Sequence, residues 1–334
     1  MTIKDLSAQT GYSVGTVSRV LNNQPNVSEK ARKAILEAAE ASGFQLNANA
    51  KQLKQSHSNA IQVVVKGTSN ELFSGMVETI QACVAETAYR LMVDYIDENS
   101  NEVLRALQLC RERKPLGIIF LGGNRSHFRQ DFQRIGVPCV LVTNDAAGLG
   151  FDNLSSVSSD DRAAACAVID RFFETGHKRV VIVGGDLEAS DTSRLRYEGC
   201  MEAFEGHNWK FDPALDYEAV RFSFEGGYRG AKNLLARGRK FTALFAMSDV
   251  MAIGAIRALR DAGLQVPGDV SVMGFDGLDI GEFMLPRLST ICQNGGAMAR
   301  RGVEMLLENI KEEQLPRYET VPFDVELRES TGEN

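Results

Sequence analysis

Polar and acidic side chains stand directly after three apolar, strand-like runs in the second half of the chain. Ser248 and Asp249 follow one run, Asp276 follows the next, and Gln293 follows the third. Ligands of open parallel α/β sheets bind beyond the carboxyl ends of the strands, so these residues are candidates for a binding pocket. Asp249 also fits the N-cap of the helix that follows it, and we favour that structural role for it.

The elements that must position these residues alternate between strand-like and helical segments. Apolar runs typical of buried strands cover Ile61–Val65, Leu91–Ile96, Gly117–Leu121, Cys139–Thr143, Val180–Val183, Ala243–Met247 and Val270–Gly274. Helical patterns lie between them, for example at Phe73–Ala88, Arg162–Thr175 and Asp249–Ala262. This alternation predicts doubly wound parallel sheets that are covered on both faces. Two successive sets of strands predict two similar lobes with a cleft between them.

Two aromatic residues and a lysine are further candidates for this cleft. Phe73 and Phe222 could stack on the apolar face of a ligand, and packing in the core is an equal alternative for each. Lys66, at the end of a strand, could face the cleft and favour an anionic ligand, or it could be a solvated strand end.

The first 58 residues have the pattern of three short helices. Ser13 suits the N-cap of the second helix, and Ser28 suits the N-cap of the third. Val17, Val20 and Leu21 share one face of the second helix at spacings i, i+3 and i+4. A helix pair alone fits an ordinary surface hairpin equally well, but three short helices make a compact unit of the size of a DNA-binding head.

The outer face of the second helix carries the residues that we expect to contact DNA. A recognition helix presents its N-terminal residues to base edges, so Val14, Gly15 and Arg19 are predicted to read bases. Arginine can pair with guanine through two hydrogen bonds. Thr16 and Ser18 suit contacts with phosphates.

The charge distribution fits a DNA-binding segment attached to an acidic body. The whole chain has a net charge of −7, which by itself argues against a nucleic-acid partner. Residues 1–58, however, hold seven basic and four acidic residues, whereas the remainder holds 30 basic and 40 acidic residues. The head can therefore contact phosphates while the body is not attracted to DNA.

Several other classes of protein are not indicated. Six widely spaced cysteines without a CxxC motif predict reduced core thiols in preference to disulfides or metal ligands. Gly184-Gly185-Asp186 lacks the full GxGxxG spacing, no GxxxxGK[ST] motif occurs, and His177 is expected in a surface turn. No apolar segment of signal or transmembrane character is apparent. We expect a soluble, cytoplasmic protein that is not an enzyme and has no metal or cofactor.

The N-terminal motifs resemble the LacI/GalR family of bacterial repressors. The recognition-helix signature TVSRVLN of that family is matched by residues 16–22, and its VSxx[TA]R third helix by residues 27–32. Its G[YF]xxN segment is matched by residues 43–47, with Leu46 where many members have proline. The resemblance implies a DNA-binding transcriptional regulator.

The family pattern continues with a hinge that folds on DNA and inserts a leucine into the minor groove. Asn47, Ala50 and Leu53 match it, and the polar segment 47–58 is too short to form a stable helix in isolation. A plain linker is the alternative. The full set of predicted DNA contacts is Thr2, Ser13, Val14, Gly15, Thr16, Ser18, Arg19, Asn22, Asn47, Ala50 and Leu53.

The resemblance extends over nearly the whole chain, and the body of this family resembles periplasmic sugar-binding proteins. Arg196 lies in a match to SARLRxxG, and the residues after the strands lie in matches to [ND]Dx[MA]AxG, a GxDD-like turn and L[ST]TIxQ. An arginine with an aspartate and a glutamine favours a sugar, although a nucleoside or phosphosugar fits Arg196 nearly as well. The predicted effector contacts are Phe73, Arg196, Phe222, Ser248, Asp249, Asp276 and Gln293.

The near lobe departs from the family pattern. Residues 65–73 replace the VPDISNPFF of many members, Thr143-Asn144 replaces a usual aspartate, and residues 121–123 replace a more polar loop. These departures leave the identity of the ligand open, but not the fold.

The expected organisation is a helix-turn-helix head (1–45), a hinge (46–58) and an effector-binding and dimerisation domain (59–334). The resemblance implies that the chain crosses between lobes near 159, 290 and 319. Lobe 1 would then hold about 59–159 and 291–318, and lobe 2 about 160–290 and 319–334. We expect a homodimeric repressor of a near-palindromic operator on double-stranded DNA, controlled by a small carbohydrate effector. The alternative is a sugar-binding or sugar-modifying protein with an accessory helical module.

Overall fold

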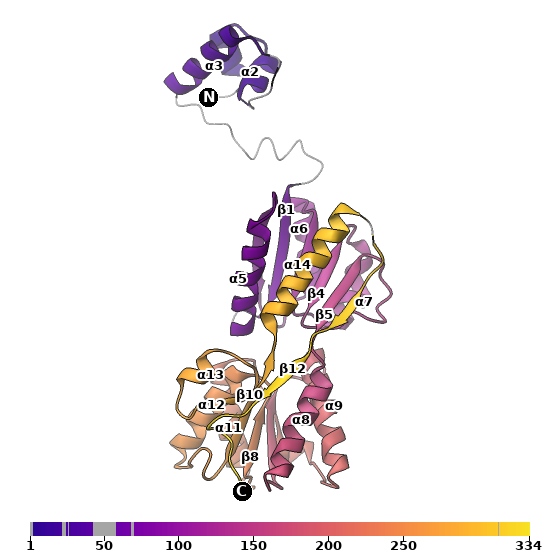
Figure 1. Ribbon diagram of the computed structural model, residues 1–334, viewed down its shortest axis with the longest axis vertical. Coiled ribbons are helices and arrows are strands. Elements are labelled where there is room, and N and C mark those ends of the chain that lie inside the picture. Colours follow the sequence, from indigo (N-terminus) through magenta and orange to yellow (C-terminus); the bar gives the residue numbers. More distant parts are fainter. Residues whose placement is uncertain (1–2, 22–24, 26, 43–57, 68–69, 313) are drawn as a thin grey trace. The chain divides into compact units, whose positions relative to one another are not determined.

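The chain divides into two compact units, Met1–His57 and Ser58–Asn334 (Figure 1). The structure is a computed structural model of the 334-residue protein, and it describes all residues except 1–2, 22–24, 26, 43–57, 68–69 and 313. Each unit has a hydrophobic core of its own, as expected of a domain.

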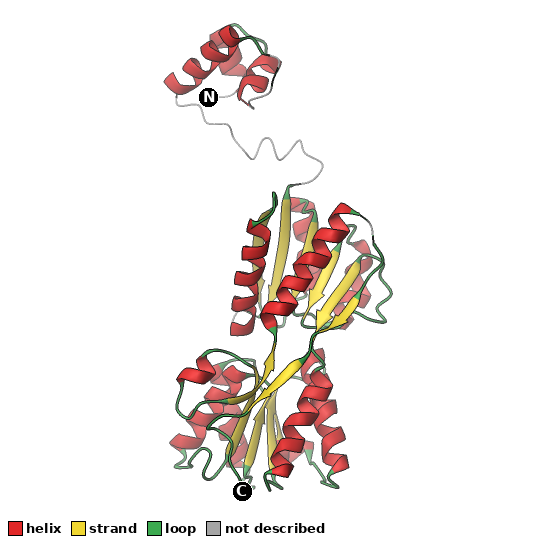
Figure 2. Ribbon diagram, in the orientation of Figure 1, coloured by secondary structure: helices red, strands yellow, loops and turns green. Residues whose placement is uncertain are grey.

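The N-terminal unit packs three helices around a small core (Figure 2). Ser13 Oγ accepts a hydrogen bond from the Thr16 amide at 3.2 Å, and Ser28 Oγ accepts one from the Ala31 amide at 3.4 Å. Gly11, with a φ of +72°, permits the turn after the first helix. These features confirm the predicted helix-turn-helix head. The helices are α1 (Ile3–Thr10), α2 (Val14–Leu21) and α3 (Glu29–Ala41), and the buried residues are Leu6, Val17, Val20, Ala31, Ile35 and Ala39.

The C-terminal unit is built on two six-stranded sheets, which confirm the predicted two-lobed α/β body (Figure 2). The strand orders are β11-β5-β4-β3-β1-β2 in the first sheet and β12-β10-β9-β8-β6-β7 in the second. All neighbours are parallel except β10 and β12. The strands are β1 (Ala60–Lys66), β2 (Arg90–Ile96), β3 (Gly117–Leu121), β4 (Cys139–Val142), β5 (Leu154–Ser158), β6 (Val180–Gly184), β7 (Tyr217–Ala219), β8 (Ala243–Ala246), β9 (Ser271–Asp276), β10 (Ser289–Gln293), β11 (Tyr318–Thr320) and β12 (Phe323–Glu326).

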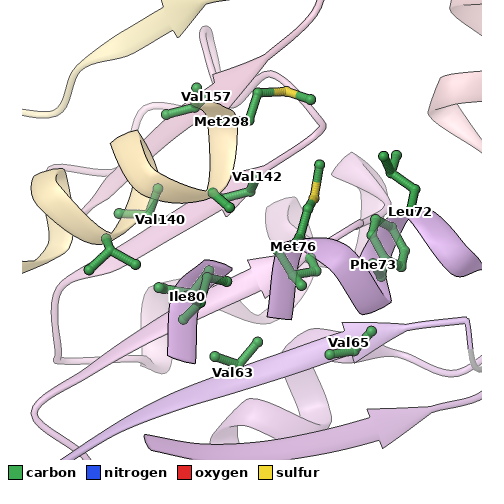
Figure 3. Packing of buried hydrophobic residues seen from close by; sticks show 14 of the residues in the cluster. Val63, Val65, Leu72, Phe73, Met76, Ile80, Val140, Val142, Val157 and Met298 are labelled. Atoms are coloured by element: carbon green, nitrogen blue, oxygen red, sulfur yellow. The ribbon is translucent and has the colours of Figure 1, made fainter. Parts of the chain in front are cut away.

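Helices cover both faces of each sheet, so each lobe has two apolar layers. In the first lobe α5 and α14 pack on one face, where Met76 and Ile80 of α5 lie over Val63 and Val65 of β1 (Figure 3). Residues of α6 and α7 pack on the other face. The second lobe repeats this plan with α8 and α9 on one face and α11 and α12 on the other. The helices are α5 (Glu71–Ala85), α6 (Glu102–Arg113), α7 (Arg125–Asp131), α8 (Asp161–Glu174), α9 (Asp191–Gly206), α10 (Pro213–Asp216), α11 (Phe224–Ala236), α12 (Asp249–Asp261), α13 (Ile280–Phe283) and α14 (Gly295–Lys311), and a 3₁₀ turn covers Phe132–Arg134.

Some strands have no apolar run and were therefore not predicted. β5 has the sequence LSSVS, and the hydroxyls of its first two serines are buried with hydrogen-bond partners. Ser156 Oγ accepts a hydrogen bond from the Ala146 amide at 2.9 Å, and Ser155 Oγ accepts one from the Arg317 amide at 3.1 Å. β7 and β11 have only three residues each, too few to show the alternation of apolar and polar residues that is typical of a strand.

The chain crosses between the lobes after β5, after β10 and between β11 and β12 (Figure 1). The first crossing follows Ser158 at the end of β5, the second follows Gln293 at the end of β10, and the third follows Thr320 at the end of β11. All three crossings lie at the β5/β11 edge of the first sheet and the β10/β12 edge of the second.

His177 is buried, which corrects the prediction of a surface turn. Its Nδ1 lies 3.0 Å from Thr242 Oγ1 and its Nε2 lies 3.0 Å from the Gly332 carbonyl oxygen. The imidazole therefore joins the end of α8 to the C-terminal segment, a contact between residues far apart in the sequence. Burial lowers the pKa of His177 below its usual range.

We expect acid to destabilise this unit partly through His177. Above about pH 6.5 the histidine is neutral in both the folded and the unfolded chain. Below that pH the unfolded chain binds the proton first, because the pKa of His177 is lowered in the folded chain. The free energy of unfolding therefore decreases by up to about 1.4 kcal/mol between about pH 6.5 and 5.5. His177→Gln should remove this part of the pH dependence. Urea unfolding at pH 7.5 and 5.5 measures it, and an equal loss of stability in the wild type and the variant would contradict the assignment.

Candidate functional site

A cavity of about 580 Å³ lies between the two lobes, where the carboxyl ends of both sheets face each other. This is the place at which open parallel sheets bind ligands, and the volume is typical of a small-molecule site. The first lobe contributes Lys66, Gly67, Asn70, Leu72, Phe73, Asp97, Glu98, Asn99, Gly122, Gly123, Thr143 and Asn144. The second contributes Gly185, Asp186, Ala189, Ser190, Thr192, Arg196, Ala219, Val220, Arg221, Phe222, Ser223, Arg229, Asp276 and Gln293.

Arg196 is a buried guanidinium on α9 at the wall of the cavity. Its Nε donates to Asp161 Oδ1 at 2.7 Å, and its Nη1 donates to the Met247 carbonyl oxygen. The guanidinium also lies 3.5 Å from the centre of the Phe275 ring. Asp161 therefore balances most of the charge of Arg196 and fixes the direction of its side chain.

Close packing of α8 and α9 brings this pair together. A Cβ atom on Gly199 of α9 would lie 2.0 Å from the carbonyl oxygen of Arg162 in α8, so only glycine permits the contact. Asp161 immediately precedes Arg162, and the short distance between the helices brings its carboxylate to Arg196.

Asp276 ends β9 and has a φ of +129°, a conformation that favours glycine. Its Oδ1 accepts a hydrogen bond from Gln293 Nε2 at 2.8 Å and lies 4.0 Å from Arg196 Nη1. Its Oδ2 is buried without a hydrogen-bond partner in the described residues. Burial raises the pKa of Asp276 to about 8, against the opposing effect of Arg196. A ligand hydroxyl is the kind of group that would satisfy Oδ2.

Ser248 and Asp249 lie outside the cavity lining, unlike the other predicted effector contacts. The N-cap of α12 is Ser248, whose Oγ accepts from the Met251 amide at 3.3 Å, so the N-cap role assigned to Asp249 was wrong. The buried Asp249 instead accepts from Thr290 Oγ1 at 2.6 Å and from the Leu278 amide at 2.7 Å. Burial raises the pKa of Asp249 to about 6. These contacts support the turn that follows Asp276.

Phe73 and Phe222 reach the cavity from opposite lobes. Both also pack in hydrophobic cores, so each combines the two roles that the sequence left open. A Cβ atom on Gly122 would lie 3.0 Å from the Phe73 ring, and one on Gly185 would lie 2.7 Å from the Phe222 ring. Small residues after β3 and β6 therefore make room for the two aromatic rings.

Lys66 lines the cavity, but it is neither a solvated strand end nor an unpaired cation. Its Nζ lies 2.5 Å from Glu102 Oε2 and 2.7 Å from the Ser100 carbonyl oxygen. Glu102 is buried and also lies 3.0 Å from His127 Nδ1. Desolvation of Glu102 would raise its pKa, but hydrogen bonds and the charge of Lys66 hold it below the usual range.

The sequence did not point to several residues at which the lobes touch. Asn144 Nδ2 donates to Thr192 Oγ1 at 3.1 Å, and Asn124 Nδ2 donates to the Ala189 carbonyl oxygen at 2.8 Å. Thr143, next to Asn144, has a φ of +80°, so strained backbone follows β4 as well as β9. The position of Thr143-Asn144 directly after β4 could have indicated a place at the cavity. Nothing in the sequence indicated their partners in the other lobe.

The described DNA-contact candidates lie on α2 or, in the case of Ser13, directly before it. Val14, Gly15 and Arg19 are exposed, whereas Thr16 and Ser18 are half-buried. Ser13 is exposed and its Oγ lies 2.9 Å from Thr16 Oγ1. The candidates Thr2, Asn22, Asn47, Ala50 and Leu53 lie outside the described residues.

Comparison with known proteins gives the same two parts. Residues 2–47 match the model of bacterial regulatory proteins of the lacI family, and residues 169–331 match that of the periplasmic binding protein-like domain. The chain is 33% identical to the HTH-type transcriptional regulator MalR of Clostridium butyricum over 98% of each protein. This chain belongs to the LacI family of bacterial regulatory proteins.

Solved structures of LacI-family regulators have the same fold. A complex of the transcriptional regulator CelR with cellobiose has a TM-score of 0.74 and 25% identity over 99% of both chains. The lac repressor dimer bound to operator and an anti-inducer has a TM-score of 0.78 at 22% identity, also over 99% of both. The relatives are transcriptional regulators, which supports a DNA-binding regulator over a sugar-modifying protein.

The described residues show neither a membrane-spanning helix nor a cluster of metal ligands. None of the described helices combines the length and apolar character needed to cross a membrane. Within the same part of the chain, no group of three or more His, Cys, Asp or Glu side chains is placed to hold a metal ion.

We expect the Arg196–Asp161 pair to be essential for folding of the second lobe. Asp161→Ala leaves a buried guanidinium without its main partner and should lower the free energy of unfolding by about 3–5 kcal/mol. The matched control is Glu202→Ala, which removes the partner of the exposed Arg162 and should cost less than about 1 kcal/mol. Urea unfolding measures both variants, and equal effects would contradict the assignment.

Proposed function

We propose that this protein is a homodimeric transcriptional repressor whose operator affinity is controlled by a neutral sugar in the cavity between the lobes. The observation that carries the proposal is the unpartnered Oδ2 of Asp276 in a polar cavity. A carboxylate oxygen held beside Gln293 and Arg196 is suited to accept a hydrogen bond from a sugar hydroxyl.

The charges around the cavity favour a neutral ligand over a phosphosugar. Four basic and four acidic side chains line it. Arg196 is paired with Asp161, Lys66 with Glu102, and Arg221 with two carboxylates, whereas Arg229 is on an exposed part of α11. A phosphate in the depth of the cavity would therefore meet cations that are already neutralised. Phe73 and Phe222 can cover the apolar face of a sugar ring.

The head is proposed to read a near-palindromic operator. Val14, Gly15 and Arg19 would contact base edges, and Thr16 and Ser18 would contact phosphates. Gly15 has no side chain to read a base, so direct discrimination depends mainly on Arg19. Asn47, Ala50 and Leu53 are retained as the proposed hinge contacts, within the division into head (1–45), hinge (46–58) and body (59–334). A regulator with this role acts where the bacterial DNA is, in the cytoplasm.

Exposed apolar side chains support dimerisation through the body. Phe283 is 84% exposed and Leu285 is 78% exposed, both in the segment from α13 to β10. Ile280, on the same short helix, is 40% exposed. Contact with a second copy would remove these large apolar groups from water. A dimer also explains why two heads would read two halves of a palindrome.

We expect Arg19→Ala to weaken binding to the selected operator by about 10- to 100-fold and to relax base preference at one position of each half-site. Selection from random DNA, followed by binding titrations at one salt concentration, measures both effects. Lys33→Ala is the control, because Lys33 on α3 is an exposed cation that lies 3.9 Å from Glu37. The absence of an enriched palindrome, or an unchanged preference in the Arg19 variant, would contradict the proposal.

We expect a thermal-shift screen to find a neutral mono- or disaccharide that stabilises the protein by mass action, while sugar phosphates and nucleosides do not. Its affinity should increase about tenfold from pH 7 to pH 9, because Asp276, with its pKa raised to about 8, must lose its proton to accept the hydroxyl. In Asp276→Asn the affinity should be at least about tenfold lower and independent of pH in this range. Titration calorimetry measures both, and an unaltered affinity in the variant would contradict the site assignment.

A further inference from the structure

One side of the cavity is lined by residues that follow the edge strands farthest from the crossings, among them Asp97, Glu98 and Arg221. The chain crosses between lobes at the β5/β11 and β10/β12 edges, whereas β2 and β7 are the opposite edge strands. Opening about the crossings therefore separates the ends of β2 and β7 the most. A contact between these ends therefore opposes separation of the lobes more effectively than a contact near the crossings.

A double salt bridge joins the lobes at this position. Arg221, which follows β7, donates from Nε to Glu98 Oε1 at 2.6 Å and from Nη2 to Asp97 Oδ2 at 2.5 Å. Asp97 and Glu98 follow β2. The two carboxylates thus accept from neighbouring N–H groups, Nε and Nη2, of one guanidinium. Among the described residues of the C-terminal unit, these are the salt bridges that join the two lobes, and the others stay within one lobe.

Local hydrogen bonds fix both partners before they meet. Asp97 Oδ1 accepts from the Asn99 amide at 3.0 Å, and the Asp97 carbonyl oxygen accepts from the Ser100 amide at 2.9 Å. On the other lobe, the Arg221 carbonyl oxygen accepts from the Ser223 amide at 2.8 Å, at the start of α11. Closing the lobes therefore restricts few rotatable bonds other than those of the Arg221 side chain.

We propose that Arg221, Asp97 and Glu98 form a latch that holds the lobes closed and sets the ligand-free balance between open and closed states. Single exposed ion pairs contribute little to the stability of a fold. A balance between two lobe arrangements, however, is decided by small free-energy differences, so a contact made only in the closed state shifts it severalfold. The consequence for sugar affinity, which rests on the proposed function, is that a neutral ligand binds more weakly at high salt, because the latch is screened.

A backbone amide reports closure without any ligand. Arg125 is the first residue of α7, so its amide has no acceptor within the helix. It donates instead to Asp191 Oδ2 of α9, in the other lobe, at 2.6 Å. Exchange of this amide with deuterated solvent therefore measures how often the lobes separate.

The test compares hydrogen exchange at Arg125 in full-length wild type, Arg221→Gln and Arg257→Gln, without ligand. Arg257 forms an exposed pair with Asp261 inside α12 and is the matched control. We expect exchange at Arg125 to be about three- to tenfold faster in the Arg221 variant and unchanged in the control. Raising the salt from about 0.05 to 0.5 M should speed exchange in the wild type and the control, but not in the Arg221 variant.

Equal exchange at Arg125 in all three proteins, or equal salt effects, would overturn the latch. If Arg221→Gln also speeds exchange in the central strand β3, that variant is globally destabilised, and Glu98→Gln is measured in its place. Faster exchange at Arg125 but not in β3 of the Glu98 variant supports the latch, and unchanged exchange at Arg125 overturns it. The readout needs no sugar, so failure of every sugar to bind would overturn the proposed effector class and leave this result intact.

Discussion

The buried guanidinium of Arg196 is the interaction on which the second lobe and its binding site depend. It connects α9 to Asp161 at the start of α8, to the carbonyl oxygen that ends β8, and to the aromatic ring before Asp276 on β9. A buried guanidinium without partners would be strongly destabilising, and here Asp161 and the Met247 carbonyl oxygen accept its hydrogen bonds, with Asp276 Oδ1 4.0 Å away. The same network leaves one oxygen of Asp276 without a partner at the cavity. The requirement to stabilise a buried cation thus also produces the site that a ligand can complete.

Much of the architecture could be predicted from the sequence because the buried strands are continuous apolar runs. Arg196 was predicted from a motif, and Asp276 and Gln293 were predicted from motifs and from their places after strands; all three line one cavity. Ser248 has the same kind of position but caps α12, because a short hydroxyl at the start of a helix meets the free amides there. The sequence position therefore identifies the edge of the sheet, but not whether a side chain points outward.

The remaining features depend on partners that lie far away in the chain. Serines in β5 are buried because distant amides bond to them, and His177 is buried because the C-terminal segment covers it. Arg221 pairs with Asp97 and Glu98 only because two lobes meet, and it follows a strand of three residues. Local periodicity carries no information about such contacts, since each is created by tertiary packing.

Regulation requires that the ligand bind two arrangements of the protein with different affinity. The most direct test is to measure the affinity for the selected operator, by fluorescence anisotropy, with and without the sugar found by thermal shift. We expect the operator affinity of the wild type to change by at least about fivefold. Asp276→Asn should bind DNA equally well and show no change at the same sugar concentration. A sugar that stabilises the wild type yet leaves its operator affinity unchanged would contradict the account.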